Sequence, residues 1–179
     1  MEKKLSRQDR IYRAAAALLT KGRLKVTFAE SCTGGMLAAA LTGVPGASDV
    51  FDGAFVTYAA EAKAQFVHVA KETIEGPGVV SAKCAMEMAK GARAAMGADI
   101  AVSVTGVAGP GGGTEKTPVG LIFIGISSKR GTRAYRFLFS GSGNGVRRAN
   151  RQAATEAAGL LLCGEAKRLC KEQASTCRC

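Results

Sequence analysis

A serine stands in a glycine-rich segment at the end of a short apolar run. Ser31 lies within residues 29–35, which read AESCTGG and follow an expected strand at 24–29. A second glycine-rich segment, residues 105–114, follows another apolar run. Glycine lets backbone N–H groups approach an anion, and the start of a following helix attracts negative charge. Ligands of open α/β sheets bind beyond the carboxyl ends of the strands, so the two segments predict one small-molecule site.

Ser31 needs a base to act as a nucleophile, because a serine hydroxyl is unreactive at neutral pH. The single histidine, His68, lies in the apolar run 66–69, where a structural role is favoured over catalysis. A lysine can replace histidine when burial lowers the pKa of its ammonium group. Tyr58 ends an expected strand and Lys63 lies one turn into the next helix, so both can face the rim that holds Ser31. Spacing alone favours the alternative of a solvated surface lysine.

Two common nucleotide-binding classes lack their motifs here. The spacing of Tyr58 and Lys63 differs from the YxxxK pattern of the short-chain dehydrogenases. Neither glycine-rich segment matches the GxGxxG dinucleotide fingerprint or the GxxxxGKS and GxxxxGKT forms of the phosphate loop. A nicotinamide-dependent oxidoreductase or a nucleoside triphosphatase therefore has little support.

Hydrophobic periodicity and turn residues predict alternating strands and helices. Only residues 128–131 join the last two strands, which forces an antiparallel pair. The alternation predicts a three-layer α/β/α domain with a mixed, mostly parallel five-stranded sheet. The strands are expected at 24–29, 50–58, 99–105, 119–127 and 132–139, and the helices at 6–21, 33–41, 59–67, 81–96 and 144–171.

The length of 179 residues, with 47% hydrophobic and 22% charged residues, is typical of one soluble globular domain. We expect this domain to span residues 1–172 and residues 173–179 to form a frayed tail. No apolar run reaches the roughly 18 residues of a membrane span, and the basic amino terminus lacks a cleavable signal pattern. These features predict a cytoplasmic protein with no membrane partner.

The net charge of +11 suggests a nucleic-acid partner until its distribution is considered. Residues 1–25 hold 8 basic and 2 acidic side chains, residues 26–143 hold 10 and 9, and residues 144–179 hold 7 and 3. The excess lies at the two ends, and the chain has no tryptophan, whereas nucleic-acid surfaces interleave basic with aromatic residues. Solvated helix faces are the favoured explanation, with steering of an anionic substrate as the alternative. We expect no specific nucleic-acid partner.

The six cysteines form neither a CxxC pair nor a dense disulfide framework, so reduced thiols are expected. Cys163, Cys170 and Cys177 repeat every seven residues and can share one face of a helix. A metal site at these cysteines is disfavoured, because the chain holds a single histidine.

The chain resembles the carboxy-terminal domain of the competence/damage-inducible protein CinA family over nearly its whole length. Characterised members of that family are nicotinamide mononucleotide amidohydrolases. Three long motifs in the family's order carry the resemblance: AESCTGG at 29–35, VPGAS at 44–48 with Gly53, Thr57, Tyr58 and Lys63, and TGVAGPGG at 105–112 with PVG at 118–120.

The resemblance implies hydrolysis of the carboxamide of nicotinamide mononucleotide to nicotinic acid mononucleotide and ammonia, without a metal or an organic cofactor. It implies that Ser31 is the nucleophile, Lys63 its proton acceptor and Tyr58 a hydrogen-bonding partner. The partner is then a small-molecule nucleotide, and we also expect a homo-oligomer. The resemblance places these residues around the substrate, with the first in a supporting role: Glu30, Thr33, Gly34, Gly35, Thr105, Gly106, Gly109, Gly111, Gly112 and Arg147.

One segment departs from the family pattern. Where the family carries Gly-Asp-Arg before its last helix, this chain reads GSGNGVR at 141–147, which lacks the Asp and its Arg but keeps Arg147. Arg147 can bind a phosphate, and a solvated place in the first helical turn is the alternative. Because the family includes inactive relatives, two other functions stay open: a non-catalytic nucleotide-binding protein and a competence- or damage-associated accessory protein. Intact Ser31, Tyr58 and Lys63 favour the amidohydrolase.

Overall fold

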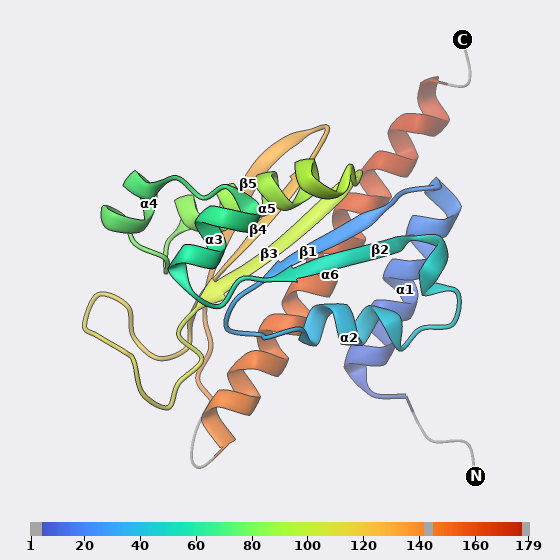
Figure 1. The fold of residues 1–179 in the computed structure, drawn as a ribbon. Helices are drawn as coiled ribbons and strands as arrows, with labels where there is room; N and C mark the ends of the chain where they lie inside the picture. The colour runs from blue at the N-terminus through green and yellow to red at the C-terminus, as the bar shows by residue number, and fades with distance from the viewer. Residues whose placement is uncertain (1–4, 142–144, 177–179) are drawn as a thin grey trace.

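The computed structural model describes residues 5–141 and 145–176, which form helices around one five-stranded sheet (Figure 1). The strands are β1 (Val26–Glu30), β2 (Phe51–Val56), β3 (Ile100–Gly106), β4 (Leu121–Ser128) and β5 (Gly131–Leu138). They lie in the order β2-β1-β3-β4-β5 across the sheet. β1 is parallel to β2 and β3, whereas β4 is antiparallel to β3 and β5. The predicted mixed sheet is confirmed, with β4 as its reversed strand.

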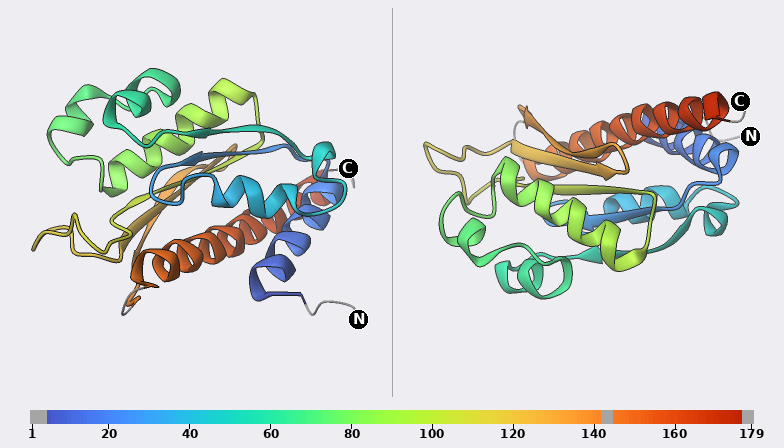
Figure 2. Two further views of the ribbon diagram at one scale, coloured as in Figure 1. Left: turned by 60° about the horizontal axis from the view of Figure 1, so that its bottom comes forward. Right: turned by 90° about the horizontal axis from the view of Figure 1, so that it is seen from above.

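Helices cover both faces of the sheet, so the predicted three layers are confirmed (Figure 2). None of the helices within the described residues combines the length and the apolar character that a bilayer span requires. A short 3-10 helix, η1 (Ala47–Asp49), leads into β2. One face carries α1 (Arg7–Gly22), α2 (Met36–Thr42) and α6 (Val146–Thr176), and the other carries α3 (Ala60–Val67), α4 (Lys71–Glu75) and α5 (Ala82–Met96).

The central strand β3 is buried on both faces, which explains its nearly continuous apolar sequence. Ile100, Val102 and Val104 belong to the hydrophobic core that lies beneath α1 and α6. Ala101 belongs instead to a second core, together with Met88 of α5. Successive side chains of a strand point to opposite faces, so both layers of helices draw on apolar residues of β3.

Helix α1 begins with a capping box and ends in close contact with α6. The hydroxyl of Ser6 accepts a hydrogen bond from the N–H of Asp9 at 3.1 Å, and the Asp9 carboxylate accepts one from the N–H of Ser6 at 3.0 Å. At the other end Arg23 adopts the left-handed conformation, with φ of 50°. A side-chain carbon at Gly22 would lie 2.7 Å from Sγ of Cys170, so this glycine allows α1 and α6 to pack closely.

Helix α6 extends further than predicted. It continues to Thr176, so residues 173–176 are helical where a frayed tail was expected. The last turns are held by the side chain of Gln173, whose Nε2 donates a hydrogen bond to the carbonyl oxygen of Gly22 at 3.3 Å. Residues 177–179, with the last two cysteines, lie outside the described residues.

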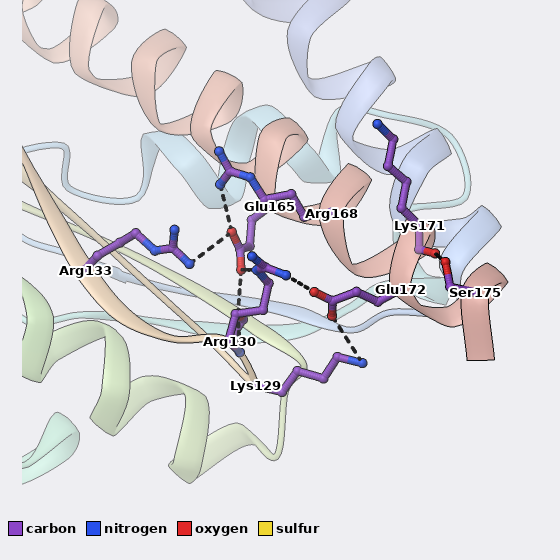
Figure 3. Close-up of polar contacts among 9 residues, drawn as sticks. Lys129, Arg130, Arg133, Glu165, Arg168, Lys171, Glu172 and Ser175 are labelled. Atoms are coloured by element: carbon purple, nitrogen blue, oxygen red, sulfur yellow. Dashed lines mark hydrogen bonds and ion pairs between the residues drawn. The ribbon is translucent and has the colours of Figure 1, made fainter.

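A buried carboxylate ties the hairpin of β4 and β5 to α6 (Figure 3). Glu165 is 1% exposed and accepts hydrogen bonds from the hydroxyl of Ser128 at 2.6 Å and from Arg168 at 3.2 Å. Arg130 and Arg133 of the hairpin lie 3.9 and 3.8 Å from the same carboxylate. A buried charge must be paired, and these groups pair it. The cluster anchors α6 at the end of the sheet where β3 begins.

Candidate active site

The first glycine-rich segment turns tightly at the carboxyl end of β1. The N–H of Ser31 donates to the carbonyl oxygen of Val104 at 2.9 Å, which keeps the serine at the edge of the sheet. Gly34 and Gly35 then have φ values of 59° and 96°, a left-handed region that other residues rarely adopt. Helix α2 therefore begins at Met36, later than predicted, and Ser31 lies in the turn between strand and helix.

Glu30, expected to support substrate binding, instead holds the start of α2. Its side chain is fully buried, and its carboxylate accepts hydrogen bonds from the N–H groups of Gly35 at 3.0 Å, Leu37 at 3.1 Å and Ala38 at 2.9 Å. The first N–H groups of a helix lack partners and carry positive partial charge, so a carboxylate suits this place. Glu30 thereby fixes the segment that carries the serine to the helix that follows it.

Lys63 reaches Ser31 directly. The lysine lies on α3 and is 1% exposed, and its Nζ lies 2.9 Å from Oγ of Ser31. The same nitrogen lies 2.6 Å from the carbonyl oxygen of Thr57 and 3.2 Å from that of Tyr58. The predicted approach of serine and lysine is confirmed, and the alternative of a solvated surface lysine is wrong.

The three contacts of Lys63 fit an ammonium group, which donates to all three oxygens, and they also fit a neutral amine. Burial lowers the pKa of the Lys63 ammonium from its ordinary value, because the charged form loses its hydration there. A neutral amine has two N–H donors and one lone pair. The carbonyl oxygens of Thr57 and Tyr58 can only accept, so they take the two donors and leave the lone pair for the hydroxyl proton of Ser31. The pair can therefore generate a serine nucleophile without histidine.

A cavity of about 270 Å³ lies over the serine and the lysine. Both glycine-rich segments contribute to its walls, as their places at the strand ends predict. A larger hollow of about 640 Å³ lies between α1 and residues 44–49, but no serine or cysteine lines it. The smaller cavity is therefore the candidate active site. Its lining residues are Ser31, Cys32, Tyr58, Lys63, Val79, Gly106, Val107, Ala108, Gly111, Gly112 and Arg147.

The predicted site residues divide between this cavity and the structure around it. Thr105 is buried, and its hydroxyl donates to the carbonyl oxygen of Val79 at 2.6 Å, so it supports the wall from behind. A side-chain carbon at Gly109 would lie 2.5 Å from Cγ1 of Val119, so this glycine serves packing within the loop. Outside the lining lie Glu30, Thr33, Gly34, Gly35, Thr105 and Gly109, whereas the other predicted residues line it. Among the remaining lining residues, Cys32, Val107 and Ala108 belong to the two predicted glycine-rich segments, and Val79 lies outside them.

Tyr58 and Arg147 face each other at the mouth of the cavity. Tyr58 is 62% exposed, and its hydroxyl oxygen lies 3.4 Å from Nη1 of Arg147. Tyr58 contacts Lys63 through its carbonyl oxygen, so it is the backbone of Tyr58 that forms a hydrogen bond with the lysine. Arg147, in the first turn of α6, is exposed and places a guanidinium group at this opening.

Cys32 lines the cavity beside the serine but is not a competing nucleophile. Burial raises the pKa of its thiol to about 11, so the thiol stays protonated at neutral pH. In the described part of the chain, the backbone N–H groups of Cys32 and Thr33 bond to no other residue. Donors that directly follow the nucleophile can stabilise the negative oxygen of a tetrahedral intermediate. The site thus combines a candidate nucleophile, a candidate base and a candidate oxyanion donor at Cys32, whereas Thr33 is buried outside the cavity lining.

Fold and site together define a three-layer α/β protein with a buried serine–lysine pair at the carboxyl edge of its sheet. Among residues 5–141 and 145–176, no group of three or more histidine, cysteine, aspartate or glutamate side chains is placed to hold a metal ion. The family model of the CinA C-terminal domain matches residues 8–162. The chain belongs to the CinA family.

Relatives of similar sequence are longer proteins. A competence-damage inducible protein of Caldicellulosiruptor bescii is 51% identical over 124 residues, which cover 69% of this chain and 30% of that protein. A CinA-like protein of Dictyoglomus thermophilum is 48% identical over 131 residues, which cover 73% of this chain and 32% of that protein. The chain spans about a third of the length of these curated relatives.

Solved structures share the whole fold. The competence/damage inducible protein CihA from Agrobacterium tumefaciens matches with a TM-score of 0.84 and 37% identity, over 90% of this chain and 97% of that chain. A CinA superfamily protein from Klebsiella pneumoniae matches with a TM-score of 0.84 and 32% identity, over 90% and 98%. The mixed sheet and its covering helices are therefore those of CinA superfamily proteins.

Proposed function

We propose that the protein is an amidohydrolase that converts nicotinamide mononucleotide to nicotinic acid mononucleotide and ammonia, a step in pyridine nucleotide metabolism. The observation that carries this proposal is the direct contact of Lys63 Nζ with Ser31 Oγ inside a cavity. Attack on a carboxamide needs a nucleophile, a proton donor for the leaving nitrogen and donors for the oxyanion. The site offers a group for each need. The resemblance of the sequence motifs to those of CinA-family amidohydrolases supports the choice of substrate.

The proposed reaction passes two protons through Lys63, one in each half of the reaction. The amine takes the hydroxyl proton while Oγ of Ser31 attacks the carboxamide carbon, and the N–H of Cys32 receives the negative oxygen. Lys63 then gives the proton to the leaving nitrogen, so ammonia departs and an ester to the serine remains. Water attacks this ester as Lys63 takes a proton from it. The acid leaves when that proton returns to the serine oxygen.

The phosphate of the substrate is expected at the mouth of the cavity. Arg147 supplies a guanidinium group there, and Gly111 and Gly112 line the same opening. Guanidinium groups and the backbone N–H groups of glycine loops both bind phosphate oxygens. Residues 142–144, where the chain departs from the family pattern, lie outside the described residues.

Incubation of the purified protein with nicotinamide mononucleotide tests this proposal. We expect ammonia and nicotinic acid mononucleotide in equal amounts, and a rate at least about a thousandfold lower in Ser31→Ala and in Lys63→Ala. Lys83→Ala, which removes an exposed lysine of α5, is the matched control and should keep the rate. Undiminished hydrolysis in either site variant would refute the assigned roles. Binding of the nucleotide without hydrolysis by the native protein would favour the non-catalytic alternative.

A further inference from the structure

Arg151 of α6 lies against the segment that carries the nucleophile. Its Nη2 atom donates a hydrogen bond to the carbonyl oxygen of Thr33. The same nitrogen would lie 3.2 Å from a side-chain carbon placed at Gly34. The guanidinium therefore touches both residues at the centre of the turn that follows Ser31. The sequence alone does not distinguish Arg151 from a solvated side chain, because it is a helical arginine in a basic terminal region.

The peptide group that Arg151 holds is linked to the backbone of the nucleophile. The carbonyl of Thr33 and the N–H of Gly34 belong to one peptide group, and that N–H donates to the carbonyl oxygen of Ser31 at 3.0 Å. Glycine lets a neighbouring peptide group rotate at little cost. A rotation of this peptide group would break the bond to Arg151 and the bond to Ser31 together. The arginine thus opposes the one movement that the glycines make easy.

Two side chains of opposite charge hold the segment from two sides. The Glu30 carboxylate accepts from the N–H of Gly35 and from α2, whereas Arg151 donates to the Thr33 carbonyl oxygen. Each charged group contacts backbone atoms of opposite partial charge. The N–H of Cys32, which precedes both attachments in a residue that lines the cavity, is left for a ligand.

The contacts of Arg151 are not those of a purely structural ion pair. Its Nε and the Thr33 hydroxyl are both buried and have no hydrogen-bond partner among the described residues. Arg151 also forms no salt bridge within the part of the chain that the structure describes. Buried polar groups without partners cost stability, so a role in stability alone explains this arginine poorly. Departures from good local packing are expected where function requires a particular geometry.

We propose that Arg151 is a positioning residue for Ser31. Its hydrogen bond to Thr33 holds the Thr33–Gly34 peptide group, and through it the backbone of the serine and the N–H groups that follow. The effect on substrate turnover rests on the proposed function. The effect on the segment itself does not depend on which substrate the protein hydrolyses.

Three variants separate the hydrogen bond from the charge and the bulk of the side chain. Arg151→Met keeps the length of the side chain but removes the donor, and Arg151→Lys keeps one donor and the charge. Arg148→Met is the matched control, because Arg148 lies on the same helix and is exposed. Circular dichroism and thermal unfolding establish that each variant is folded.

Three measurements are made on each variant. They are kcat and KM with nicotinamide mononucleotide, the rate at which a fluorophosphonate labels Ser31, and amide hydrogen exchange over residues 31–36. In Arg151→Met we expect kcat and labelling to fall about tenfold, KM to stay within about twofold, and exchange to rise about tenfold. Arg151→Lys should recover most of both rates, and Arg148→Met should match the native protein.

The outcomes distinguish this inference from the proposed function. Labelling and exchange that are unchanged in Arg151→Met would overturn the positioning role, even if the native protein hydrolyses the nucleotide. Slower labelling with unchanged exchange, or no recovery in Arg151→Lys, would overturn it as well. If the native protein fails to hydrolyse the nucleotide but labelling and exchange respond as expected, the substrate is wrong and the positioning role stands. If the native serine is not labelled, the proposed function fails and exchange alone decides the inference.

Discussion

The amine nitrogen of Lys63 lies 2.9 Å from the hydroxyl oxygen of Ser31, although the two residues follow different strands. Ser31 comes directly after β1, and Lys63 lies on the helix after β2. The parallel register of these strands pairs Glu30 with Val56, so the two chain segments leave the sheet side by side. The sheet thereby brings the proposed nucleophile and base together, although they lie 32 residues apart in the sequence.

Turnover should rise with pH if Lys63 is the base. Its pKa lies below the ordinary value of 10.5, and only the neutral amine can accept the serine proton. We expect kcat/KM to increase about tenfold per pH unit below this pKa and to level off above it. Initial rates across neutral and alkaline buffers, with unfolding monitored in parallel, measure this profile. A rate that does not vary with pH would argue against Lys63 as the base.

The same lysine should make the stability of the protein depend on pH. Its pKa is lower in the folded state than in the unfolded chain, so between the two values the unfolded chain binds more protons. The free energy of unfolding should therefore rise with pH across that window, up to about 10.5. Lys63→Met lacks the titrating amine and therefore this pH dependence. The melting temperature of the native protein minus that of the variant should thus increase with pH. The buried thiols of Cys32 and Cys84 interact with Lys63, so the curves are compared well below pH 9.0, the ordinary pKa of a thiol, where these groups stay protonated in both proteins. Two parallel curves there would contradict this expectation.

Tyr58→Phe should change kcat by less than about threefold, because the tyrosine contacts Lys63 through its carbonyl oxygen and not its hydroxyl. Its hydroxyl faces Arg147, so the variant should alter mainly KM for the nucleotide. Steady-state kinetics of the variant measure both constants. A large loss of kcat at unchanged KM would restore the hydroxyl to a direct part in the chemistry.

Arg147→Ala should raise KM for nicotinamide mononucleotide about tenfold or more, because charge-assisted bonds to a phosphate are worth about 1.5–3 kcal/mol. Turnover of the dephosphorylated riboside should barely change, since the riboside lacks the group that the guanidinium binds. Arg148→Ala is the control for loss of a positive charge from the same helix. Equal losses on both substrates would show that Arg147 does not bind the phosphate.

Glu30→Gln should destabilise the protein by about 2–4 kcal/mol. The amide keeps the size of the carboxylate, but its NH2 group faces N–H donors of Gly35, Leu37 and Ala38 that need an acceptor. Urea unfolding measures the change, with Glu61→Gln on the exposed side of α3 as the control. Equal stability of the two variants would show that Glu30 is not needed to hold α2.

Local signals were sufficient to predict the layers and the strand ends, whereas the assignment of Lys63 as the base for Ser31 needed the family resemblance, because spacing alone favours a solvated lysine. The glycine-rich segments mark strand ends, and a serine without an available histidine requires another base. Glu30 was placed at the substrate, in a supporting role, because the family resemblance implied it. Its actual partners are the N–H groups of α2, which become visible only once the two left-handed glycines delay the helix. Arg151 could not be found in this way, because its contact joins segments 118 residues apart.

The length of helix α6 also sets the distance between two of its contacts with the rest of the protein. Arg151 contacts the nucleophile segment at one end of the sheet, and Glu165 contacts the hairpin at the other. Their spacing of 14 positions corresponds to about 21 Å and nearly four helical turns, so both side chains leave the helix on nearly the same side. One inserted residue would rotate one attachment by about 100° relative to the other. Sequences that keep this site can therefore vary the composition of α6 between Arg151 and Glu165 far more easily than its length.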